Sequence, residues 1–193
     1  KNSEIYMDPS FWWSHPGGDV QPSPMVGLKI EGRSSRIIIE NNHIHHVATS
    51  GIWTGAYVDG PFAGGLEYSV YRNNFVHHVR DFQRITYVNG QPQPAIGLPN
   101  TVAIGFGNLV GFNDLEDNVT AWGDDQAMGA DSSSGTLTFK RNIMLFFDNE
   151  ALKTRPWRAP LPYPYRDVAA DNIVLFTGFV GGGTAYVWHK WFA

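Results

Sequence analysis

Residues 36–47 read RIIIENNHIHHV, and residues 68–79 read YSVYRNNFVHHV. The two stretches share an Asn-Asn pair, an apolar residue two places later and the tripeptide His-His-Val. Weaker copies of the pattern follow at residues 109–119, 137–147 and 167–177. Self-similarity at a nearly constant period is the sequence signature of a repeat architecture.

Alignment of the copies on one asparagine gives a column of anchor residues: Asn42, Asn74, Asn113, Asn142 and Asn172. The spacings are 32, 39, 29 and 30 residues, and the positions three before and two after each anchor are apolar in every copy. Asparagine tolerates the left-handed backbone of a tight corner, and stacked amides can bond from one layer to the next. We therefore expect a solenoid of coils about 4.8 Å apart, with an asparagine ladder at one corner.

The composition favours an all-β domain. Of the 193 residues 42% are hydrophobic, and 21 Gly and 12 Pro interrupt most windows that are long enough for a helix. The apolar runs are short, rich in Ile, Val, Phe and Tyr, and flanked by turn-forming residues, which is typical of strands. A β-sandwich is the alternative architecture, but it gives no reason for the asparagines to stay in register.

The charge balance and the residue inventory exclude several classes of function. Lys and Arg number 14 against 18 Asp and Glu, so a basic nucleic-acid-binding surface is not expected. No apolar stretch approaches the roughly 18 residues of a transmembrane helix, so membrane insertion is not expected. The lack of cysteine excludes disulfides and thiolate metal sites. The first residue is Lys1 rather than Met, which indicates a processed chain or a fragment of a longer solenoid.

The motifs ENNHIHHV, RNNFVHHV and KRNIMLFF, with Gly51-Ile52 after the first, resemble those of right-handed parallel β-helix repeat proteins of the pectate-lyase-like superfamily. The resemblance covers about residues 27–180. It implies an all-β, right-handed parallel β-helix of about five or more coils. Residues 1–26 would form an N-terminal extension packing on the solenoid, and residues 181–193 an aromatic C-terminal segment.

Members of this superfamily include polysaccharide lyases, glycoside hydrolases, tail spikes and adhesins. The resemblance therefore implies an extracellular or periplasmic protein that binds and cleaves a polysaccharide, as a hydrolase or a lyase. The alternative is a non-catalytic structural or adhesive module, which other chains or the remainder of a longer polypeptide would complete. One scaffold carries many activities, so the site residues must decide.

An acidic cluster offers the carboxyl pair of a glycoside hydrolase: Asp124, Asp125, Asp148 and Glu150. Hydrolysis needs two carboxyl groups about 5–5.5 Å or 6.5–9.5 Å apart, and neighbouring coils would bring these residues within that range. The segment beginning at Asp125 also resembles the D-x-G-A-[IM] segment of some β-helix hydrolases, with a departure at the central position. In the alternative interpretation these acids are solvated turn residues or bind a structural Ca²⁺. No cofactor is required for hydrolysis.

The basic segment ALKTRPWRAP offers the groups of a polysaccharide lyase. Lys153 would take the proton next to a uronate, and Arg155 would neutralise the uronate carboxylate. Arg158, Trp157 and Trp122 are candidate substrate-binding residues. An ordinary surface loop is the alternative interpretation of the charges.

Histidines and terminal aromatic residues form two further patterns. The pairs His45-His46 and His77-His78 occupy equivalent repeat positions, so we expect them to stack on adjacent coils, with His43 beside them. We interpret them as turn residues rather than metal ligands, because no carboxylate occupies the same two columns. Tryptophans near both ends of the chain are expected to cover the open ends of the solenoid. Asn118-Val119-Thr120 is a lone glycosylation sequon, which carries little weight.

Overall fold

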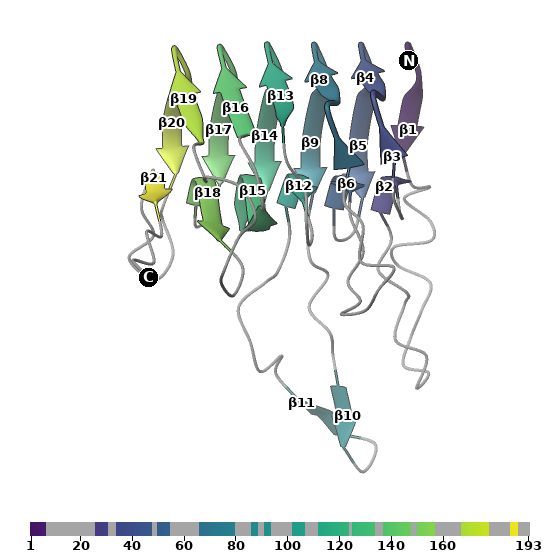
Figure 1. Ribbon diagram of the computed structural model, residues 1–193. Helices are drawn as coiled ribbons and strands as arrows, with labels where there is room; N and C mark the ends of the chain where they lie inside the picture. Colours follow the sequence, from purple (N-terminus) through teal and green to yellow (C-terminus); the bar gives the residue numbers. More distant parts are fainter. Residues whose placement is uncertain are drawn as a thin grey trace.

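A computed structural model describes residues 1–6, 26–30, 34–47, 50–54, 66–79, 86–88, 91–93, 102–106, 112–123, 125–133, 137–147, 150–156, 167–177 and 186–188 of the chain. Within these ranges the chain forms β-strands and no helix. The strands wind into a right-handed parallel β-helix, as the resemblance implies (Figure 1). No helix in the described ranges is long and apolar enough to cross a membrane.

Three parallel sheets run along the solenoid. Sheet 1 contains β1 (Glu4–Tyr6), β5 (His43–Val47), β9 (Phe75–Val79), β14 (Val119–Gly123), β17 (Ile143–Phe147) and β20 (Ile173–Thr177). Sheet 2 contains β2 (Val26–Ile30), β6 (Ser50–Thr54), β12 (Val102–Phe106), β15 (Gln126–Ser133), β18 (Glu150–Pro156) and β21 (Tyr186–Trp188). Sheet 3 contains β4 (Ile38–Glu40), β8 (Val70–Arg72), β13 (Asn113–Glu116), β16 (Leu137–Lys140) and β19 (Val168–Ala170).

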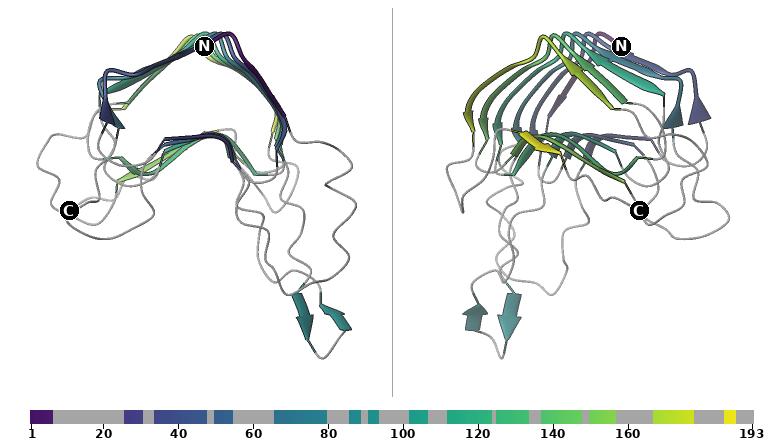
Figure 2. Two further views of the ribbon diagram at one scale, coloured as in Figure 1. Left: turned by 90° about the vertical axis from the view of Figure 1, so that its right-hand side faces the viewer. Right: turned by 60° about the vertical axis from the view of Figure 1, so that its left-hand side comes forward.

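Each full coil passes from sheet 3 to sheet 1 to sheet 2, and the coils superimpose when viewed along the stack (Figure 2). The short strands β3 (Ser34–Ser35) and β7 (Leu66–Glu67) also pair in parallel, ahead of sheet 3. The terminal strands β1 and β21 pair in parallel with β5 and β18. Strands that pair with the solenoid therefore also come from residues 1–26 and 181–193.

The core lies between the three sheets and is built from columns of equivalent residues. One column contains Ile39, Tyr71, Leu115, Phe139 and Ala169, each paired with the next across neighbouring strands. All but Ala169 are buried. The column two residues after the corner asparagine is likewise buried at Ile44, Val76, Thr120 and Met144. The side chains that close-pack in this interior provide most of the apolar burial that stabilises the fold.

The expected asparagine ladder is present at the corner between sheets 3 and 1. Its members are Asn42, Asn74, Asn118, Asn142 and Asn172, and each side-chain amide donates to the side-chain oxygen of the next at 2.9–3.0 Å. The same Nδ2 atoms of the last four also donate to a backbone carbonyl in the sheet 3 strand of the preceding coil, at 2.9 Å. The left-handed backbone belongs to the residue before each asparagine, with φ between 52° and 57°. The amide thus satisfies the corner's backbone groups while its neighbour makes the turn.

The sequence alignment was wrong at the third anchor. Asn113 lies in β13 opposite Leu137, and its side-chain oxygen accepts from the Ser69 amide at 2.9 Å. The ladder member of that coil is Asn118, so the predicted third-copy core positions Val110 and Leu115 shift to Leu115 and Thr120. The error arose because two asparagines five residues apart both sit in an apolar, acidic context. Asn118 is fully buried, so its sequon is not a glycan acceptor in the folded chain.

A long connection joins β9 to β12. It contains an antiparallel hairpin of β10 (Thr86–Val88) and β11 (Gln91–Gln93). The hairpin projects away from the coils on the side of sheet 2 (Figures 1 and 2).

Candidate functional site

The corner between sheets 1 and 2 has an aromatic ring on each of five successive described coils. We call these residues the corner column: His46, His78, Trp122, Phe146 and Phe176. Each follows its ladder asparagine by four residues. Ring centroids of neighbours lie 4.7–5.7 Å apart, and three of the four pairs are within 5° of parallel.

The corner column owes its geometry to the backbone. All five residues have φ between 51° and 59°, a left-handed conformation that turns the side chain outward at the end of a sheet 1 strand. Such a conformation in a residue other than glycine costs on the order of 1–3 kcal/mol. Offset stacking of aromatic rings stabilises the fold by about 0.5–1.5 kcal/mol per pair. The stacked rings therefore offset the backbone strain of this corner.

The column borders an exposed apolar face. Exposed fractions are 42% for Trp122, 37% for Phe146 and 58% for Phe176. On the outer face of sheet 1 beside them, Leu175 is 48% and Ile173 is 50% exposed. A contiguous exposed patch of large apolar side chains often marks a binding surface.

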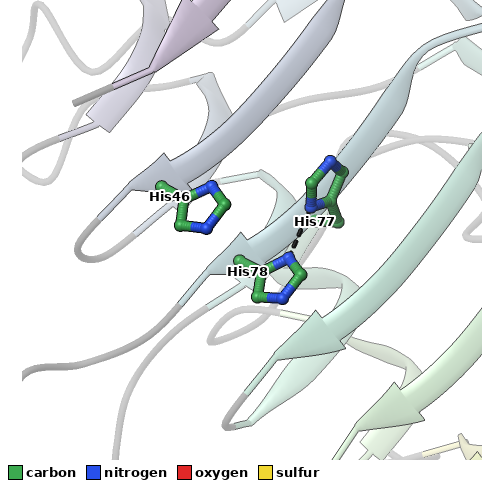
Figure 3. Close-up of side chains that lie close together, drawn as sticks. All are labelled: His46, His77 and His78. Atoms are coloured by element: carbon green, nitrogen blue, oxygen red, sulfur yellow. Dashed lines mark hydrogen bonds between the residues drawn. The ribbon is translucent and has the colours of Figure 1, made fainter. Parts of the chain in front are cut away.

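Towards the N-terminal coils the same face carries histidines. Beside His46 lie two further histidines of β5, His43 and His45, and two of β9, His77 and His78. Figure 3 shows His46, His77 and His78 close together. The Nδ1 atoms of His45 and His46 are 2.7 Å apart, and those of His77 and His78 are 2.5 Å apart. The His45 ring stacks on that of His77 at 5.2 Å, which confirms the expected stacking on adjacent coils.

A carboxylate reaches this group from the first coil. Glu4 pairs with His43 in the β1–β5 register, and its Oε1 lies 3.2 Å from His45 Nε2 and 3.5 Å from His43 Nδ1. Glu4 thus occupies the column of His43. The columns in which the sequence showed no carboxylate are the other two, those of His45 and His46. Ser3 replaces the ladder asparagine in this coil and donates its N–H to Asn42 Oδ1 at 3.2 Å, so the anchor pattern did not reveal Glu4.

The His77 imidazole is held in its neutral form near neutral pH. Burial, followed by the neighbouring histidines, of which His78 has the largest effect, lowers the pKa of His77 to about 4. A neutral imidazole keeps a lone pair for a hydrogen bond or a metal ion.

The acidic and basic candidates meet on sheet 2. The Asp125 carbonyl accepts the Glu150 N–H at 2.9 Å, which places these residues on neighbouring coils. The Gln126 amide donates to the Asp125 carboxylate at 3.2 Å, and the Lys153 amine lies 3.1 Å from the Glu150 carboxylate. Asp125 is 4% exposed and Glu150 9%. A catalytic lysine needs a free amine, whereas this one is paired with a carboxylate.

The other predicted site residues fall largely outside the described part of the chain. Asp124, Asp148, Trp157 and Arg158 lie outside the described residues, and so does the side chain of Arg155, whose backbone belongs to β18. Trp122 is placed on the corner column, three residues before Asp125.

Sequence reasoning missed Phe146 and Phe176. The signal was present, because the residue four places after each ladder asparagine is aromatic in all five copies. It was hidden by the third anchor, since four places after Asn113 stands Asp117 rather than Trp122.

No protein-family model, no curated protein and no solved structure matches the chain.

Proposed function

We propose that this chain is an extracellular or periplasmic β-helix of the pectate-lyase-like superfamily that binds a polysaccharide along its corner column. The observation that carries the proposal is the row of exposed rings at Trp122, Phe146 and Phe176, one on each of three successive coils. A polymer with a repeating unit fits a surface that repeats.

The chemistry of the row suits a sugar chain. The exposed edges of the stacked aromatic rings offer apolar area of fixed geometry, against which the C–H groups of a pyranose can pack. The rings repeat at the coil spacing of about 4.8 Å, so a glycan lying along the solenoid would contact several rings at once. Because the rings are already stacked, little side-chain entropy is lost on binding.

Cleavage is the second candidate function. It is favoured by the Glu150 N–H bond to the Asp125 carbonyl, which sets two carboxyl-bearing residues on neighbouring coils. It is disfavoured by the burial of both residues and by the pairing of Glu150 with Lys153. Binding without cleavage is therefore the stronger proposal.

A structural or adhesive module remains the competing class, because the exposed apolar face of sheet 1 would also fit a protein partner. The two classes differ in what they bind. A glycan-binding face retains soluble polysaccharide, whereas a protein-docking face does not.

The test is affinity electrophoresis of the full chain through gels that contain neutral or uronic polysaccharides. We expect at least one polysaccharide to retard the chain, and Trp122→Ala to abolish the retardation. Tyr68→Ala is the matched control. Tyr68 is 56% exposed, and its ring stacks on that of Phe112, with 5.1 Å between the centroids, outside the corner column. Absence of retardation by every polysaccharide would contradict the proposal.

The same polysaccharides test cleavage through the release of reducing or unsaturated ends. If cleavage occurs, Asp125→Asn should lower turnover by orders of magnitude while leaving the fold intact. Cleavage at the wild-type rate in Asp125→Asn would exclude the proposed pair.

A further inference from the structure

We propose that His46, His77 and His78, at the N-terminal end of the corner column, bind one divalent transition-metal ion of the Zn²⁺ type. This site is separate from Trp122, Phe146 and Phe176, the rings that carry the proposed glycan binding. One ring nitrogen from each residue lies within 4.8 Å of the other two (Figure 3). Around a tetrahedral zinc ion with Zn–N bonds of about 2.0–2.1 Å, ligand nitrogens are roughly 3.3 Å apart. Small ring rotations therefore bring the three nitrogens onto one ion.

The backbone orients the rings for this purpose. The side chains of consecutive residues in a strand normally point to opposite faces, so two adjacent histidines would not normally bind the same metal ion. Here the left-handed conformation of His78, with φ of 52°, brings its Nδ1 to that of His77. His46 has the same φ on the preceding coil and stacks on His78 at 4.7 Å.

Neighbouring groups hold the three rings in place. His43 Nε2 lies 2.8 Å from His77 Nε2. His45 links His46 to the Glu4 carboxylate, with its Nδ1 2.7 Å from His46 Nδ1 and its Nε2 3.2 Å from Glu4 Oε1. A hydrogen bond to the second ring nitrogen of a ligating histidine fixes its ring, and His45 is the partner that His46 has for this bond.

The donor set selects the class of metal. Imidazole nitrogen suits Zn²⁺, Cu²⁺ and Ni²⁺, whereas Ca²⁺ and Mg²⁺ require oxygen ligands. Three protein ligands leave a fourth position of a tetrahedral ion for water or an incoming molecule.

The competing explanation is that the histidines only continue the aromatic stack. The chain itself supplies variants that separate the two explanations. Phe146 occupies the column of His78, and Leu145 occupies the column of His77 through the β9–β14–β17 register. The substitutions His78→Phe and His77→Leu therefore keep side chains that this fold accepts and remove the metal ligands.

The test is isothermal titration of ZnCl₂ into the chelator-treated full chain, with Co²⁺ absorption spectra as a second readout. We expect one Zn²⁺ per chain and a tetrahedral Co²⁺ spectrum. His78→Phe and His77→Leu should each weaken Zn²⁺ binding at least tenfold, with thermal unfolding near that of the wild type. Phe176→Leu, at the far end of the corner column, should bind Zn²⁺ like the wild type.

Two outcomes would overturn the inference. One is the absence of Zn²⁺ binding by the wild-type chain. The other is undiminished binding by His78→Phe, and in that case loss of binding in Glu4→Gln would place the ion at Glu4, His43 and His45 instead. Neither outcome bears on retention by polysaccharide gels, so the proposed function stands or fails separately.

Discussion

The side-chain amide of Asn74 donates to the side-chain oxygen of Asn118 at 3.0 Å, although 44 residues of chain separate the two. The next bond of the ladder, from Asn118 to Asn142, spans only 24 residues. The ladder therefore holds the coils in register while the connection between them changes in length. This is how a solenoid accepts a long insertion without losing its corner.

Replacement of Asn118 by Leu should lower the free energy of unfolding by about 1–3 kcal/mol, because it leaves buried polar groups without hydrogen-bond partners. The groups affected are the Asn74 amide and the Tyr71 carbonyl. Urea unfolding measures the change. Asn41→Gly is the control, because Asn41 is exposed with φ of 57°, which glycine adopts freely. Equal stability of the two variants would show that the ladder does not hold the coils.

A side chain at Gly51 should also destabilise the fold. A Cβ there would lie 2.6 Å from the carbonyl oxygen of Ala103 and would press against the Val76 side chain in the core. Overpacking of this kind costs about 1–3 kcal/mol. We expect Gly51→Ala to lower the thermal unfolding midpoint by several degrees, whereas Ser35→Ala on the exposed surface leaves it unchanged. An unchanged midpoint for Gly51→Ala would contradict the close approach of β6 and β12.

Acid should weaken the fold through Glu40. Its carboxylate is 3.0 Å from the Lys1 amine and accepts from Arg72 Nε at 2.7 Å, and these bonds, that of Lys1 first, lower the pKa of Glu40 below its ordinary value of 4.5. The folded state therefore binds this proton less readily than the unfolded state. The stabilisation is present above about pH 4.5 and is lost as the pH falls through the lowered pKa.

Unfolding midpoints measured between pH 7 and pH 2 test this relation. Glu40→Gln should be less stable than the wild type at pH 7, and the difference should shrink as the pH falls below about 4.5. Asp171→Asn removes a carboxyl at an exposed left-handed corner and should follow the wild-type curve. A constant gap between Glu40→Gln and the wild type at all pH values would rule out the titration of Glu40 as the cause.

The sequence predicted the fold better than the site. Asn42, Asn74, Asn142 and Asn172 were assigned to one corner because the apolar positions around them recur. Asn113 was misassigned because single-sequence alignment cannot tell an insertion before the corner from one after it. The pairing of Leu115 with Tyr71 settles the register.

The site depended on that register. With the third coil shifted by five residues, the column through His46, Trp122 and Phe176 could not be recognised. The contact of Glu4 with His45 was out of reach for another reason, since Ser3 interrupts the asparagine pattern in the first coil. The pairing of Glu150 with Lys153 is a side-chain geometry that spacing alone does not distinguish from solvent exposure.

The most direct test of the central claim is the dissociation constant for a polysaccharide that retards the chain, measured by titration calorimetry. The account predicts that the double substitution of Trp122 and Phe146 by Ala weakens binding at least a hundredfold, because each lost ring contact contributes about 1.4 kcal/mol or more. Tyr68→Ala should bind like the wild type. Equal affinity of the wild type and the double variant, with both folded by circular dichroism, would contradict the claim that the corner column is the glycan-binding surface.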